Sequence, residues 1–263
     1  MASLVVLVQE NHGVPSQPYS LSVAPSSHRI LGLDIQSMTV DAATALLAGR
    51  LDGRQKTLVA FANANLLQYA RKRPELLSAL RQFLILNDGI ALELASRLLH
   101  GMGFAANLNG TDFVPRLLHD LGGKRVFLYG ARPEVVARAA ARLTGEGIVV
   151  AGTMDGFQRD RSDAVRAANT AGADIVLVAL GNPLQELWIS EHAAALDAPL
   201  VLGVGALFDF LSGTVRRAPL WVQRAKLEWA FRLAQEPTRL VRRYAVDTPQ
   251  FLFAAWRERR IRQ

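Results

Sequence analysis

The sequence has 263 residues, of which half are hydrophobic, and its 30 basic against 23 acidic residues give a net charge of +7. This composition excludes a disordered chain and allows a full core in one large domain, with or without an appendage. There is no cysteine, which excludes disulfides and cysteine-based zinc sites and fits a reducing compartment.

The start of the chain carries no targeting signal that we recognise. The apolar run in MASLVVLVQE is too short for a signal peptide and lacks a basic start. Proline, serine and glycine follow, so residues 1–28 are expected to form a loose leader. No stretch approaches 18 apolar residues without a charge, and no membrane-spanning helix is expected.

Strand and helix signals alternate from residue 29 to residue 213. The expected strands are 57–62, 83–86, 125–129, 147–151, 174–179 and 200–204. The expected helices are 39–49, 64–80, 90–100, 111–121, 132–144, 161–171 and 184–195. Several strands are continuous apolar runs, typical of strands covered on both faces. The pattern predicts an α/β fold, a Rossmann-like, mostly parallel sheet with helices on both faces.

The pattern changes in the last fifty residues. Segments 219–245 and 248–261 read as amphipathic helices, so a helical appendage is expected over 214–263. This appendage holds eleven arginines and one lysine against four acidic residues, a net charge of +8, which leaves about −1 for the rest. An arginine-rich tail favours phosphate partners, namely nucleic acid, anionic lipid or a diphosphate substrate.

Polar residues and glycines follow the expected strands. Ligands of open α/β sheets bind beyond the carboxyl ends of the strands, so these residues mark a candidate cleft. They are Asn63, Asn87, Asp88, Gly89, Gly130, Arg132, Gly181, Asn182, Gln185, Glu186 and Asp209.

Asp88 ends an apolar strand in the stretch RQFLILNDGI. In one interpretation it belongs to an Asn-Asp-Gly turn or caps the helix that starts at Ile90. In the other it is a general base whose pKa is tuned by an apolar wall. The residues alone leave both interpretations open.

Other short motifs are weak by themselves. LYGARPE resembles a phosphate-binding turn and GNPLQE starts a helix, but both also fit ordinary tight turns. Neither GxGxxG nor a Walker A motif is present, which argues against dinucleotide, methyltransferase-type or P-loop ATP binding. HExxH, Asp-x-Asp and G-x-S-x-G are also missing, so no metal site and no cofactor are predicted.

Seven motifs in order resemble the WecG/TagA/CpsF glycosyltransferase family over residues 30–245. They are LNDG, NGTDFVPRLL, VFLYGARPEV, GF, ADIVLVALGNPLQELWI, GVGALFDFLSGTVRRAPLW and LEWAFRLAQEPTRLVRRY. The resemblance implies a Rossmann-like fold of the GT-E type with a C-terminal appendage. It also implies a metal-independent, inverting transfer of a hexose from a UDP-sugar to a polyprenyl-diphosphate-linked sugar.

Within the family, the sequence looks most like the xanthan-pathway β-1,4-glucosyltransferases. That likeness implies glucose as the transferred sugar, in the assembly of an exopolysaccharide repeat unit. The alternative is a transferase for N-acetylmannosamine or N-acetylmannosaminuronic acid. Many members carry Thr-x-Asn after the first core strand, whereas this chain has Phe61-Ala62-Asn63. We interpret Phe61 as an argument against N-acetylmannosamine-type substrates.

The resemblance assigns Asp88 the role of catalytic base. It places Gln185 near the nucleotide-sugar and the loop after Gly130 in the uridine-diphosphate region. The arginines of the appendage are expected to steady the diphosphate. The full set of implied substrate-binding residues is Asn63, Asn87, Gly89, Thr111, Asp112, Gly130, Arg132, Gly181, Asn182, Gln185, Glu186, Asp209, Arg217, Arg232, Arg239, Arg242 and Arg243.

The resemblance also implies a peripheral protein at the cytoplasmic face of the plasma membrane. Phe251, Phe253 and Trp256 are expected to face the bilayer. For Trp221 and Trp229, packing on the core and membrane contact remain equally open. A nucleic-acid partner is not expected, because a basic tail does not explain the cleft motifs, and a homo-oligomer is left open.

Overall fold

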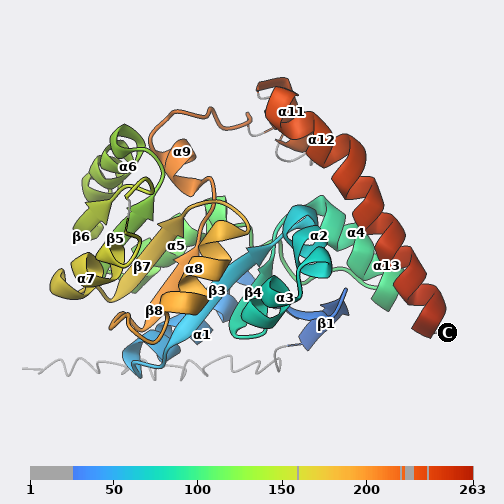
Figure 1. Cartoon of the computed structure of the whole chain (residues 1–263), viewed down its shortest axis with the longest axis horizontal. Helices are drawn as coiled ribbons and strands as arrows, with labels where there is room; N and C mark the ends of the chain where they lie inside the picture. Colours follow the sequence, from blue (N-terminus) through green and yellow to red (C-terminus); the bar gives the residue numbers. More distant parts are fainter. Residues whose placement is uncertain (1–25, 159, 220, 223–227, 236, 263) are drawn as a thin grey trace, which may run out of the picture.

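The structure, a computed structural model, describes residues 26–158, 160–219, 221–222, 228–235 and 237–262. In these residues an eight-stranded sheet has the order β1-β2-β4-β3-β8-β7-β5-β6 (Figure 1). The strands are β1 (Ser26–Ile30), β2 (Leu33–Ser37), β3 (Thr57–Ala62), β4 (Phe83–Asn87), β5 (Arg125–Gly130), β6 (Val149–Met154), β7 (Ile175–Ala179) and β8 (Leu200–Gly203). β1 and β2 form an antiparallel hairpin, whereas the other described pairs run parallel.

Helices connect the strands and continue after the last one. They are α1 (Val40–Asp52), α2 (Ala64–Lys72), α3 (Pro74–Leu80), α4 (Ile90–His100), α5 (Gly110–Leu121), α6 (Pro133–Gly145), α7 (Asp163–Thr170), α8 (Leu184–His192), α9 (Leu207–Leu211), α11 (Glu228–Gln235), α12 (Pro237–Arg242) and α13 (Thr248–Arg262), with a π-helical segment η1 (Arg243–Asp247). The predicted α/β class and the helical C-terminal segment are therefore confirmed.

Alternate residues of β3 show how the two faces of the sheet are buried. Leu58 and Ala60 face one core, which includes residues of α2, α3, α4, α7, α8 and α13. Val59 and Phe61 face the other core, which includes residues of α1, α5, α6 and α9. Because helices cover both faces, the central strands need apolar side chains at every position, which explains their continuous apolar runs.

The structure adds a hairpin that the sequence pattern does not reveal. β1 begins at Ser26, so the last three residues of the predicted leader, 26–28, lie in the sheet. This edge strand buries only His28 and Ile30, which leaves too little hydrophobicity for the strand to stand out. The rest of the predicted leader lies outside the described residues.

Two other boundaries differ from the expectation. The single helix expected over 64–80 is divided at Arg73, which has an extended backbone (φ −134°, ψ 97°). The following Pro74 disfavours a helical conformation at Arg73 and cannot donate a backbone hydrogen bond, so a new helix starts there. The strand expected over 147–151 instead runs from Val149 to Met154.

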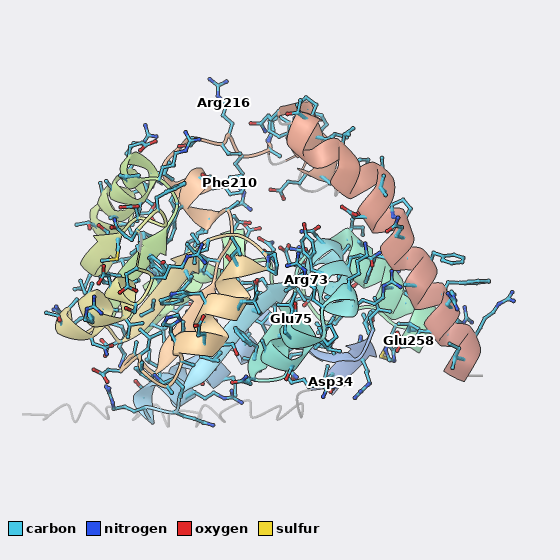
Figure 2. The ribbon with its side chains drawn as sticks, viewed as in Figure 1. Asp34, Arg73, Glu75, Phe210, Arg216 and Glu258 are labelled. Carbon is cyan, nitrogen blue, oxygen red and sulfur yellow. The ribbon has the colours of Figure 1, made fainter. Side chains whose placement is uncertain are left out.

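The C-terminal helix α13 packs along α4 and α2, as Figure 1 shows. Phe251 and Ala255 are fully buried in the same core as α2 and α4, so the expectation that Phe251 faces a bilayer is wrong. Glu258, on α13, is labelled in Figure 2. Its Oε2 accepts a hydrogen bond of 2.9 Å from the amide of Leu31, at the turn of the hairpin. Phe253 projects outward and is 59% exposed. In the part of the chain that is described, no helix has the length and apolar character needed to cross a membrane.

Candidate functional site

Two cavities open at the carboxyl edge of the parallel strands. The larger, about 940 Å³, is lined by residues that follow β3, β4, β5, β7 and β8. The smaller, about 480 Å³, lies between the end of β4, residues 104–109 and the starts of α11 and α13. Asn63, Asp88 and Thr111 line both cavities and therefore form their common wall.

Asp88 stands directly after β4 in this common wall. Its backbone N–H donates a 2.7 Å hydrogen bond to the carbonyl oxygen of Ala62, which extends the pairing of β3 and β4 by one step. The N-cap position of α4 is occupied by Gly89, with φ 95°, and not by Asp88. The side chain of Asp88 is therefore placed at the junction of the cavities, as the base interpretation requires.

The residues on either side of Asp88 tie the end of β4 to the next loop. Asn87 donates a 2.9 Å hydrogen bond from Nδ2 to the carbonyl oxygen of Ala106, and the Gly89 amide donates to Asn107 Oδ1 at 3.0 Å. Asn87 Oδ1 is buried and has no hydrogen-bond partner among the described residues. Asn87 thus lines the smaller cavity with an acceptor that is buried in its wall and unsatisfied by the described residues.

The N-terminal turn of α5 holds Thr111 in place. Asn109 Oδ1 accepts hydrogen bonds from the Asp112 amide at 3.0 Å and from Thr111 Oγ1 at 2.8 Å. Asn109 Nδ2 donates to Asp112 Oδ2 at 2.8 Å. Asp112 lines neither cavity and instead pairs with Arg217, whereas the other three residues of the NGTD motif border the site.

Gly130 allows β5 to end closely against β7. Its φ is 125°, and a Cβ at this position would lie 2.4 Å from the carbonyl oxygen of Ala179. The next residues, Ala131 and Arg132, line the larger cavity. Arg132 is the N-cap of α6 and makes no side-chain capping bond, so the N-terminus of this 13-residue helix borders the cavity. Backbone N–H groups at such a position favour an anion.

The GNPLQE segment contributes side chains from the start of α8. Gln185 lines the larger cavity, accepts a hydrogen bond from the Gly205 amide at 3.0 Å and donates one to Glu186 Oε1 at 2.8 Å. Asn182 also lines this cavity, and its Nδ2 is buried without a hydrogen-bond partner in the described part of the chain. The wall of each cavity thus contains an amide group with one buried polar atom that no described residue satisfies.

A family profile described as "Glycosyl transferase WecG/TagA/CpsF family" matches residues 28–263. The chain belongs to this glycosyltransferase family. An N-acetylglucosaminyldiphosphoundecaprenol N-acetyl-beta-D-mannosaminyltransferase of Bacillus subtilis (strain 168) is 34% identical over 178 residues, 66% of this chain and 68% of the relative. A protein of the same name from Bacillus spizizenii is 34% identical over 180 residues, 67% of this chain and 69% of the relative.

The cavities of this WecG/TagA/CpsF family member bring together most of the residues predicted from the sequence. These are Asn63, Asn87, Asp88, Gly89, Thr111, Arg132, Gly181, Asn182, Gln185 and Asp209. Four predicted residues line neither cavity, namely Asp112, Gly130, Glu186 and Arg217. Arg232, Arg239, Arg242 and Arg243 lie in α11, α12 and η1, but their side chains are outside the described part of the structure.

The larger cavity also has basic residues that the sequence analysis missed. Lys72, the last residue of α2, and Arg138, in the second turn of α6, line it together with Arg132. Lys72 is far from any strand end, so no positional signal points to it. Arg138 follows the LYGARPE motif, and a helical projection of that motif would have been the available clue. No cluster of three or more His, Asp or Glu side chains suited to a metal occurs among the described residues.

Glu186 of the glycosyltransferase is fully buried beside Gln185. Desolvation raises the pKa of its carboxyl group to about 7, against the opposing effect of the hydrogen bond from Gln185. Its Oε2 has no hydrogen-bond partner among the described residues. Glu186 therefore supports the orientation of Gln185 from behind the cavity wall, as a carboxyl group that burial keeps protonated below neutral pH.

The buried carboxyl predicts a pH-dependent stability. Unfolded Glu186 ionises near its ordinary pKa of 4.5, whereas the folded residue ionises near 7. Between these values the unfolded state loses a proton that the folded state keeps, so stability falls as the pH rises and levels off above 7. Relative to wild type, Glu186→Gln should gain about 3 kcal/mol of unfolding free energy between pH 4.5 and 8, measured by urea denaturation.

The matched control is Glu191→Gln, which changes an exposed residue of the same helix. If the free energies of unfolding of Glu186→Gln and wild type differ by the same amount at every pH in this range, the protonated, buried carboxyl is contradicted.

Proposed function

We propose that this glycosyltransferase moves an N-acetylmannosamine-type sugar from a UDP-sugar to a sugar carried on a polyprenyl diphosphate. The observation that carries the proposal is the position of Asp88 in the wall shared by two cavities. A transferase needs one site for each substrate and a base where the two meet. The names of the two Bacillus relatives, which specify a lipid-diphosphate-linked acceptor and an N-acetylmannosaminyl group, support the choice of substrates.

The larger cavity suits the UDP-sugar. Its volume, about 940 Å³, lies within the usual range for ligand sites. The N-terminus of α6, Arg132 and Arg138 supply positive charge for the diphosphate. These groups are fixed before the reaction and face the leaving UDP as its negative charge grows. Each could lower the barrier by roughly 2–4 kcal/mol if it acts like an oxyanion-hole donor.

The smaller cavity suits the acceptor sugar. It is lined by the polar side chains Asn87, Asn107 and Asn109 and by the indole of Trp229. Amides that accept and donate hydrogen bonds, next to an aromatic face, are the usual surroundings of a bound sugar. Thr248, at the start of α13, closes the same cavity from the C-terminal side.

In the proposed reaction, a hydroxyl of the acceptor sugar approaches the anomeric carbon of the donor from the face opposite UDP. Asp88 takes the proton of this hydroxyl as the new carbon–oxygen bond forms. The bond between the anomeric carbon and UDP breaks with its electron pair going to UDP, and the configuration inverts. The arginines of the appendage, Arg232, Arg239, Arg242 and Arg243, are proposed to hold the diphosphate of the lipid acceptor.

The likeness to glucosyltransferases and the names of the two relatives imply different donor sugars. Both relatives are N-acetylmannosaminyltransferases by name, and neither supports glucose or a xanthan pathway. Phe61 is only 5% exposed and packs against Phe113, with ring centroids 6.4 Å apart. A Cβ on Gly110 would lie 3.0 Å from this ring. The ring thus packs in the core and also lines the larger cavity. The choice of N-acetylmannosamine therefore rests on the names of the two relatives, against the expectation drawn from Phe61.

Donor preference tests the proposed substrates directly. Purified protein is given N-acetylglucosaminyl-diphospho-polyprenol with UDP-N-acetylmannosamine or UDP-glucose. The N-acetylmannosamine donor should have the higher kcat/KM, by roughly tenfold or more, since a site that pairs with an acetamido group rejects a donor lacking it. Faster transfer from UDP-glucose to glucosyl-diphospho-polyprenol would restore the glucosyltransferase interpretation.

Asp88→Asn should keep the fold and the binding of UDP but lower kcat by about 10² to 10⁴-fold, the usual contribution of a general base. Thermal unfolding and UDP titration verify that only the chemical step is affected. The comparison variant is Asp209→Asn, since Asp209 lines only the larger cavity and should act mainly on the KM for the donor. A near-normal kcat for Asp88→Asn would remove Asp88 from the reaction.

We further propose that α13 attaches the enzyme to the cytoplasmic face of the plasma membrane. The rings of Phe253 and Trp256 stack with centroids 5.6 Å apart, and the Arg260 guanidinium lies 4.2 Å from the Trp256 centroid. Ile261, at the end of the helix, is 80% exposed. Aromatic residues combined with arginines suit the interface of an anionic bilayer.

Replacing both Phe253 and Trp256 by alanine should lower the affinity for phosphatidylglycerol vesicles about tenfold or more, since the apolar area that enters the bilayer is lost. Sedimentation with vesicles measures the change. Phe157→Ala is the matched control, because this aromatic residue is 72% exposed but lies at the larger cavity. Equal loss of binding in both variants, or no loss in either, would contradict attachment through α13.

A further inference from the structure

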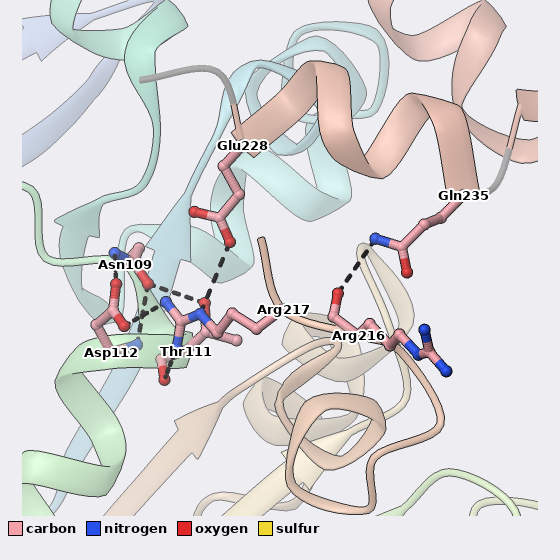
Figure 3. A network of polar contacts seen from close by, with 7 residues as sticks. All are labelled: Asn109, Thr111, Asp112, Arg216, Arg217, Glu228 and Gln235. Carbon is pink, nitrogen blue, oxygen red and sulfur yellow. Dashed lines mark hydrogen bonds and ion pairs between the residues drawn. The ribbon is translucent and has the colours of Figure 1, made fainter. Parts of the chain in front are cut away.

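Arg216 and Arg217 hold the short helix α11 at both of its ends. Arg217 Nε lies 3.8 Å from Oε1 of Glu228, the first residue of α11. The carbonyl oxygen of Arg216 accepts a 3.2 Å hydrogen bond from Nε2 of Gln235, the last residue of α11. Figure 3 shows both contacts, with the guanidinium of Arg216 pointing away from the helix. Two consecutive residues thus contact the first and the last residue of α11.

The guanidinium of Arg217 also reaches the N-terminal turn of α5. Its Nη2 pairs with Asp112 Oδ1, and its Nη1 donates a 3.4 Å hydrogen bond to the carbonyl oxygen of Thr111. Asp112 is itself fixed by two hydrogen bonds to Asn109 (Figure 3). The planar guanidinium can contact three partners in different directions, which the single ammonium group of a lysine cannot do.

The two helices joined by Arg217 are two walls of the smaller cavity. α11 contributes Glu228 and Trp229 to this cavity, and α5 contributes Thr111. Arg217 lines neither cavity. It therefore connects the walls from outside, without contact to a molecule bound between them.

We propose that Arg217 is a positioning residue that holds α11 against α5 and so sets the width of the smaller cavity and the affinity for its occupant. The identity of that occupant, the sugar of a polyprenyl-diphosphate acceptor, rests on the proposed function. This role differs from direct binding of a diphosphate, because the guanidinium already lies between the carboxylates of Asp112 and Glu228.

The expected effect is moderate. The side chains of Arg217 and Glu228 are 31% and 32% exposed, and an ion pair at such a site changes an equilibrium by up to about fivefold. In Arg217→Ala, hydrogen exchange of residues 228–235 should be about three- to fivefold faster in the absence of substrates. The KM for a short-chain polyprenyl-diphosphate N-acetylglucosamine acceptor should rise by a similar factor, while kcat and the donor KM stay within about twofold.

The matched control is Arg216→Ala. It removes the same charge from the neighbouring residue, but it keeps the backbone carbonyl that binds Gln235 and leaves Arg217 intact. The hydrogen exchange of residues 228–235 and the KM for the acceptor should both equal those of wild type. Arg217→Lys, which retains the charge near Asp112 without the planar fork, should fall between wild type and Arg217→Ala.

Unchanged exchange of α11 in Arg217→Ala would overturn the anchoring role. Faster exchange with an unchanged acceptor KM, or with an equal rise of the donor KM, would overturn the effect on the acceptor. If Arg217→Ala is poorly folded, Asp112→Asn weakens the pair that holds Arg217 on α5, at a residue that lines neither cavity, and gives the same two tests. If wild type transfers no sugar, the proposed function fails, and the exchange experiment still decides whether Arg217 anchors α11.

Discussion

The hydrogen bonding of β3 to β4 on one side and to β8 on the other determines where this molecule can bind substrates. β4 follows β3 through α2 and α3, whereas β8 is the last strand of the sheet. The connection that leaves the carboxyl end of β3 therefore leads to β4 and away from β8, and a crevice opens between β3 and β8 at this edge. Asn63, the first residue after β3, borders both cavities for this reason. One reversal in strand order thus opens two cavities with Asp88 in their common wall, the arrangement on which the proposed transfer between two substrates is built.

The central elements could be predicted because their burial is uniform. The strand over 57–62 and the helix over 90–100 were predicted with the bounds that the structure has, since the strand is a continuous apolar run and the helix has a strong helical periodicity. The β1–β2 hairpin lies at an edge and buries only alternate residues, so its signal is weak. Phe251 and Phe253 are indistinguishable by composition. Only the packing of α13 on α4 decides that the first is buried and the second exposed.

The lining of the cavities was predicted where it follows from position after a strand. Asn87, Asp88 and Gln185 line them because parallel strands end at one edge. Glu186 was assigned to the cleft as the neighbour of Gln185, but one step along a helix turns a side chain by about 100°, and here the turn leads into the core. Arg217 was assigned from a motif, whereas its partners, some hundred residues earlier, are visible only in three dimensions.

The two hydrogen bonds already made by Gln185 limit what it can offer to a bound sugar. A glutamine amide has two N–H donors and an oxygen with two acceptor positions. Glu186 takes one donor, and the amide of Gly205 takes one acceptor position. The Gln185 amide, which lines the larger cavity, keeps one N–H donor and one acceptor position. The two bonds already made fix which end of the amide is the donor and which is the acceptor. A sugar hydroxyl, which both donates and accepts, can satisfy the two together in one orientation. An epimer with that hydroxyl on the other face of its ring would leave the remaining donor and acceptor of Gln185 without partners. The bonds of Gln185 to Glu186 and Gly205 would therefore make this side chain sensitive to the stereochemistry of the sugar ring.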